Sequence, residues 1–115
     1  MQVAQETIDA RTRVVTVTGE LVGSTGLRLV RMARAALEES AERLIVDLTA
    51  MTFMDSGGLA ALIATWSAAA ERGAKLAVVL MPDSHALRSL ELRGVAGVFS
   101  VVATREEALA RVDES

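Results

Sequence analysis

Two short and almost unbroken apolar stretches constrain the fold of this chain more than any other feature. The first runs from Leu44 to Leu48, and the second runs from Lys75 to Leu80. Strands that helices cover on both faces have this composition, whereas strands with one face in water alternate apolar and polar residues. The two stretches therefore predict central, parallel strands of an α/β domain.

The segment between the two predicted strands has the periodicity of an amphipathic helix that ends at Gly73. We expect its apolar side chains at helical spacing to face the core, with the Trp66 side chain able to reach the edge of that core. Alanines on the remaining surface leave an uncharged side, which is unusual for a helix face in water and would suit a partner. The apolar set is Leu59, Leu62, Ile63, Trp66 and Ala70, and the alanines are Ala60, Ala61, Ala64, Ala68 and Ala69.

The remaining segments complete a single domain over residues 1–115. We expect an α/β fold with a mixed, largely parallel sheet, an N-terminal hairpin and about four helices. The expected segments are a hairpin of Val3–Ile8 with Arg13–Thr18, a helix over Thr25–Glu39 with Val30, Ala33 and Leu37 inside, a helix from Asp83 and Ser84 towards Gly94, a strand over Val98–Val102, and a final helix capped by Thr104 with Ala108, Leu109 and Val112 on one face.

Composition excludes several classes of function. The net charge of −3 gives no overall positive field, so we expect no direct binding of nucleic acid. The chain has no cysteine and one histidine, which argues against redox chemistry, a metal site or a cofactor. Its longest apolar run, from Leu59 to Ala70, is too short for a membrane span, and Met1–Asp9 lacks the pattern of a secretory signal. We therefore expect a cytoplasmic protein that does not insert into membranes.

The connection between the first central strand and its helix carries the most specific motif. It reads Phe-Met-Asp-Ser-Gly-Gly-Leu over residues 53–59 and opens the helix. This segment resembles the STAS domain family, in particular the bacterial anti-sigma factor antagonists. The resemblance extends to Gly19–Leu21, to Leu90–Gly94 with Val98 and Phe99, and to the helix of residues 104–109.

The resemblance implies a binding module in a bacterial partner-switching pathway that regulates transcription. Such proteins bind an anti-sigma factor that is also a serine kinase, which releases the sigma factor, and phosphorylation at this helix start inactivates them. A helix start suits such a switch because its N–H groups favour anionic charge. The implied partner-binding residues are Asp55, Ser56, Gly57, Gly58 and Leu59.

Two residues depart from the family pattern. Gly57 stands where the family carries the hydroxyl residue that is phosphorylated, and Val22 stands where an acidic residue is common. Ser56 is the remaining hydroxyl, and we expect it to cap the helix, which makes it a poor phosphate acceptor. These departures predict constitutive binding. They also leave an alternative open: a non-phosphorylated STAS scaffold subunit that binds the ATPase of a phospholipid-transport ABC complex.

No residue pattern supports an enzyme. His85 follows Asp83 and Ser84, but neighbours in a helical first turn point in different directions and cannot form a triad. Asp47 and Asp55 flank the connection without a partner that would tune either carboxylate for acid or base work. The sequence leaves the oligomeric state open.

Overall fold

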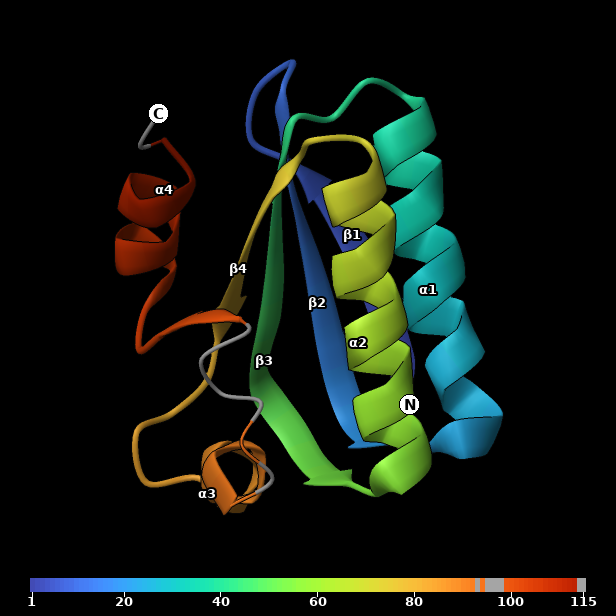
Figure 1. Cartoon of the computed structure of the whole chain (residues 1–115), viewed down its shortest axis with the longest axis vertical. Helices are drawn as coiled ribbons and strands as arrows, with labels where there is room; N and C mark the ends of the chain where they lie inside the picture. The colour runs from blue at the N-terminus through green and yellow to red at the C-terminus, as the bar shows by residue number, and fades with distance from the viewer. Residues whose placement is uncertain (93, 95–98, 114–115) are drawn as a thin grey trace.

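In the computed structural model, which describes residues 1–92, 94 and 99–113, five strands form one sheet in the order β1-β2-β3-β4-β5 (Figure 1). The first two strands are antiparallel and the others run parallel, which confirms the predicted hairpin and the parallel centre. The elements are β1 (Gln2–Thr7), β2 (Thr12–Leu21), α1 (Gly23–Glu38), β3 (Arg43–Met54), α2 (Ser56–Glu71), β4 (Lys75–Val79), α3 (His85–Leu92), β5 (Ser100–Val102) and α4 (Arg105–Asp113).

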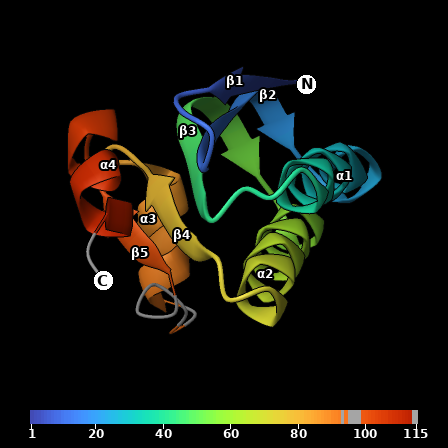
Figure 2. The same cartoon turned by 90° about the horizontal axis from the view of Figure 1, so that it is seen from above.

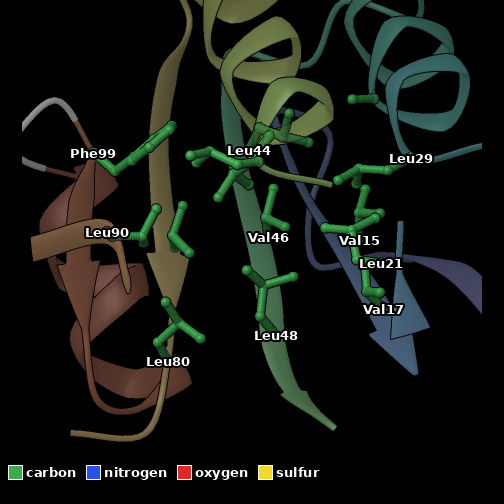
Figure 3. Close-up of a cluster of buried hydrophobic side chains, with 14 of the residues drawn as sticks. Val15, Val17, Leu21, Leu29, Leu44, Val46, Leu48, Leu80, Leu90 and Phe99 are labelled. Atoms are coloured by element: carbon green, nitrogen blue, oxygen red, sulfur yellow. The ribbon is translucent and has the colours of Figure 1, made fainter. Parts of the chain in front are cut away.

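Helices cover both faces of the sheet. Figure 2 shows α1 and α2 on one side and α4 on the other. The larger core cluster joins the strands to α1, α2 and α3, with Val46, Leu62 and Leu90 fully buried (Figure 3). The smaller cluster lies under α4, where Ile45 and Ala108 are fully buried. Burial on both sides explains why the central strands lack alternation.

The small side chains of α2 pack against α1. Ala61, Ala68 and Ala69 are buried, and a Cβ atom built at Gly26 of α1 would lie 2.6 Å from Cβ of Ala61. The predicted use of this alanine face for a partner is therefore wrong at these three positions, because another helix of the same chain covers them. Small residues here permit close helix contact.

The predicted core face of α2 is rotated from the observed one. Leu59 and Leu62 are buried as expected, but Ile63 and Ala70 are exposed, and Trp66 is half-buried at the core edge. In the other helices, Leu29 takes the buried place that was expected for Val30, and Leu109 is exposed. Val98, expected to open the last strand, and Arg93 of the family-like segment lie outside the described residues.

Strand β3 is longer than the sequence suggested, because residues 51–54 continue it instead of forming a loop. Its pairing with β2 shifts twice, between Thr16 and Thr18 and between Gly19 and Glu20, and each shift places an extra residue on β3. Bulges bend a strand and increase its twist. The bend carries the end of β3 to the end of β2, so that both strands deliver their helices at one edge of the sheet (Figure 1).

Candidate functional site

The candidate site lies where β2 and β3 end side by side. Leu21 pairs with Met54 at the last position of the two strands, and Asp55 N donates to the carbonyl of Leu21 at 3.3 Å. Helix α1 begins two residues after Leu21, and α2 begins two residues after Met54. Parallel pairing therefore brings two helix starts together at the carboxyl edge of the sheet, where α/β proteins commonly bind their ligands.

Asp55 caps α2. Its Oδ1 atom accepts a hydrogen bond from Gly58 N at 2.8 Å, and its backbone is extended, as an N-cap requires. Capping by Ser56 is therefore a wrong prediction, since Ser56 is the first helical residue. Its side chain is exposed, and within the described residues its hydroxyl makes no hydrogen bond. Capping therefore does not occupy the Ser56 hydroxyl, contrary to expectation.

The backbones of the two helix starts touch at glycine. A Cβ atom at Gly57 would lie 2.5 Å from Cα of Gly23 and 2.8 Å from its nitrogen, which is closer than real contacts allow. A Cβ atom at Gly58 would overlap the carbonyl group of Leu21. Gly57 therefore makes a backbone contact with α1, and a side chain at this position requires the helices to separate.

Burial divides the five predicted partner-binding residues into two sets. Asp55 and Ser56 are exposed and Gly57 is half-buried, whereas Gly58 is buried and Leu59 is only 7% exposed. A partner at this edge would touch the first three. Gly58 and Leu59 lie beneath the surface, where they pack against β2 and the core. The sequence motif alone could not distinguish the exposed set from the buried one.

The start of α1 is built differently from that of α2. Val22 occupies the N-cap position with an extended backbone but has no side-chain oxygen to accept a hydrogen bond. Thr25 satisfies part of this turn, because its Oγ1 atom accepts from Val22 N at 3.2 Å. Val22 therefore lies beside the glycine contact as an apolar residue, where an acidic side chain would place a negative charge.

An ion pair behind the site holds the bent part of β3. Oδ1 of Asp47 accepts from Thr49 N at 2.9 Å and from the Thr49 hydroxyl at 2.7 Å, next to the first bulge. Its Oδ2 atom accepts from Nε of Arg105 in α4 at 2.7 Å. Arg105 also donates to Thr16 of β2 and to Glu6 of β1. One arginine thus connects α4 to three strands.

The ionisation of Asp47 follows from these contacts. Burial by itself would raise the pKa of this carboxyl, but the hydrogen bonds from Arg105 and Thr49 outweigh it and hold the pKa below its usual value. Asp47 is therefore a charged structural residue. No partner for Asp47 could be named from the sequence alone, because Arg105 is 58 residues away.

An apolar groove of about 560 Å³ continues the surface beyond the end of β3. It lies between β3 and α3, and its lining includes the exposed apolar side chains of Phe53 and Met81 and the half-buried side chain of Met51. His85 lines it too, with an exposed side chain, and no triad surrounds it in the described residues. Sequence reasoning missed this groove because residues 51–54 were taken as a loop. A phenylalanine at position 53 of that loop was a usable signal, because large apolar side chains on a surface often mark interaction sites.

Among residues 1–92, 94 and 99–113, no three His, Asp or Glu side chains lie close enough to hold a metal ion. The same ranges contain no helix that is both long and apolar enough to cross a membrane.

Comparison with known proteins places these features in a family context. A model of the STAS domain matches residues 3–108. Among solved structures, an anti-sigma factor antagonist from Mycobacterium paratuberculosis is 28% identical, with 98% of this chain and 94% of that chain covered and a TM-score of 0.84. The unphosphorylated anti-sigma factor antagonist SpoIIAA, of Bacillus, is 21% identical over 99% of this chain and 100% of its own, with a TM-score of 0.72.

The fold also matches proteins of another class. A sulfate transporter family protein from Wolinella succinogenes is 19% identical, with 94% of this chain and 89% of that chain covered and a TM-score of 0.73. No curated protein sequence matches the chain.

Proposed function

Since the chain belongs to the STAS domain family, we propose that it is an anti-sigma factor antagonist-like regulator that binds a kinase-type anti-sigma factor in the cytoplasm of a bacterium. Its contact surface is the start of α2, with Asp55, Ser56 and Gly57 at the centre. Binding of this kind needs no catalysis by the chain itself. The similarity to structures of anti-sigma factor antagonists supports this class of partner.

The Gly57 contact carries the regulatory part of the proposal. Glycine has no hydroxyl, and Gly23 leaves no room for a larger residue at this position. A kinase that recognises this helix start finds its usual acceptor absent. The neighbouring Ser56 hydroxyl is displaced by roughly 100° around the helix, which takes it off the line of transfer. The unphosphorylated, binding-competent form therefore persists, and abundance or the state of the partner controls the protein.

A second candidate function remains, because the same observation fits it. A STAS scaffold subunit that binds the ATPase of a phospholipid-transport ABC complex also works without phosphorylation. STAS-like folds in a sulfate transporter family protein support a transport context for some members of the fold. The two candidates differ in the partner, and both use a surface of this domain.

Affinity capture of the tagged chain from its native host, followed by mass spectrometry, separates the candidates. The proposal predicts a serine-kinase anti-sigma factor among the captured proteins, and capture of a transporter ATPase instead would contradict it. Ser56→Arg adds a bulky cation to the exposed centre of the surface and should reduce capture at least about tenfold. Glu38→Arg, at the exposed far end of α1, is the matched control and should leave capture unchanged.

A further inference from the structure

Strand β1 is an open and unprotected edge of the sheet. It is the terminal strand in the sheet order, and its pairing with β2 runs from Gln2 to Thr7 without a bulge. Natural edge strands are usually blunted by proline, lysine or a bulge. Residues 2–7 contain none of these, and their one charged side chain, Glu6, is held by Arg105. This edge therefore retains the ability to pair.

The hydrogen-bonding groups of the open side can be assigned from the hairpin. Ile8 N donates to the carbonyl of Thr12 at 3.0 Å, so this position bonds across the hairpin. Bonded and non-bonded pairs alternate along antiparallel strands. The N–H and C=O groups of Val3, Gln5 and Thr7 consequently point away from β2, towards the open edge.

A contact from α1 agrees with this assignment. The carbonyl of Met1, two residues before Val3, accepts a hydrogen bond from Nη1 of Arg28 at 3.3 Å. The side chain of an α1 residue thus already reaches the open side of the strand and bonds to its backbone. The positive charge of Arg28 therefore lies beside any strand that pairs with β1.

A groove of about 680 Å³ is lined by residues 1–5, at β1, and by side chains of α1. Figure 2 shows these two elements as neighbours at one end of the sheet. Val3, Met32 and Ala35 form the apolar floor of the groove. Arg28 and Arg31 also line it, because residues three apart lie on the same side of α1. No carboxylate lines it. Within the described residues Arg31 forms no ion pair, so the groove is locally basic although the chain is net acidic.

We propose that β1 binds an extended, acidic segment of a partner protein as an additional strand. The backbone of the segment pairs with the outward groups of Val3 and Gln5, its apolar side chains lie on the floor of the groove, and its carboxylates face Arg28 and Arg31. Main-chain pairing supplies affinity in such strand addition, and the side-chain positions supply specificity. The proposal uses none of the residues at the start of α2 and is independent of the function proposed for them.

The charge of the groove disfavours a second copy of this chain as the occupant. Pairing of two β1 strands about a two-fold axis would bring the arginines of both α1 helices to one seam, and like charges at close range repel. An acidic segment instead finds complementary charge. A short capped peptide that alternates valine with glutamate is therefore a suitable probe.

Titration of the probe into the intact chain, followed by fluorescence polarisation, tests the proposal. The glutamate peptide should bind, with slowed amide exchange at Val3 and Gln5, and a matched peptide with lysine for glutamate should bind at least about tenfold more weakly. Equal binding of the two peptides, or protection that leaves Val3 and Gln5 unchanged, would overturn the proposal.

Variants at the edge make the test specific. Gln5→Pro removes the outward N–H but no bond to β2, a position at which edge strands tolerate proline, whereas Gln5→Ala keeps the donor. Gln5→Pro should weaken binding about tenfold relative to Gln5→Ala. Arg31→Glu, at an exposed helix position that leaves the strand intact, should also weaken binding of the glutamate peptide about tenfold.

Full binding by either Gln5→Pro or Arg31→Glu would refute strand addition at this groove. Sedimentation of the chain alone checks the competing occupant. Self-association that Gln5→Pro abolishes would assign the edge to a second copy and overturn the proposal.

Discussion

The starts of α1 and α2 lie against each other but are built in different ways. Asp55 caps α2 with a carboxylate, whereas Val22 begins α1 without a side-chain acceptor. Between them, the absence of a side chain at Gly57 allows its backbone to touch that of Gly23. The comparison teaches that two adjacent helix starts can be capped differently while glycine at position 57 lets them touch.

Disrupting the contact between Gly58 and the backbone of Leu21 should have the largest effect on stability. In Gly58→Ala the new Cβ atom overlaps the carbonyl of Leu21, so β2 and α2 must move apart. We expect a loss of about 3 kcal/mol in the free energy of unfolding, measured by urea denaturation. A bulky acidic residue at Gly58 would likewise act on the fold and could not serve as a clean test of partner binding.

The matched control for Gly58→Ala is Gly23→Ala. A Cβ atom at Gly23 would lie 3.7 Å from Cα of Gly57, which is an ordinary contact. Alanine also favours the helix by up to about 1 kcal/mol. Gly23→Ala should therefore leave the free energy of unfolding unchanged or raise it. An equal loss of stability in Gly58→Ala and Gly23→Ala would contradict the close contact between Gly58 and Leu21.

The ion pair behind the site should make the next contribution. Asp47→Asn removes the charge that Arg105 and Thr49 bond to and should cost about 2 kcal/mol near neutral pH. Because the folded-state pKa of Asp47 is lowered, its contribution is complete above the unfolded pKa and is lost as the pH falls through the folded value.

Urea denaturation at a series of acidic pH values measures this effect. The difference in stability between the parent and Asp47→Asn should shrink as the pH falls below the ordinary aspartate range. A difference that stays constant to the lowest pH at which both proteins fold would show that Asp47 is not charged in the folded state.

The two caps can be made alike by substitution, with a smaller effect. Asp55→Ala removes the acceptor for Gly58 N and gives α2 an uncapped start like that of α1, at a cost of about 1 kcal/mol. Ser56→Ala removes a hydroxyl that bonds to no described residue and should change the thermal midpoint little. A larger loss for Ser56→Ala than for Asp55→Ala would reverse the assignment of the cap.

The sequence predicted the order of elements and the parallel centre because these depend on local apolar patterns. Near-continuous apolar composition is typical of strands that helices cover on both faces, and it marked Leu44–Leu48 and Lys75–Leu80 as such strands. The motif of residues 53–59 likewise located the helix start correctly. These features need no knowledge of distant residues.

Features that depend on distant residues were not predictable in the same way. The alanine side of α2 looked free because its spacing does not reveal that Gly26 of α1 fits against it. Asp47 looked isolated because Arg105 follows it much later in the chain. The bulges that extend β3 to Met54 arise from its pairing with β2, so residues 51–54 resembled a loop. Asp55 and Ser56 are both good N-cap residues, and only the geometry decides between them.

Intact-mass measurement of the chain, after incubation with ATP and the anti-sigma factor captured from its host, tests the central claim most directly. We predict that the parent mass stays unchanged and that the complex persists, because position 57 offers no hydroxyl and Ser56 is out of line. Stoichiometric addition of a phosphoryl group that disappears in Ser56→Ala, together with release of the partner, would contradict the account and restore a displaced phosphorylation switch.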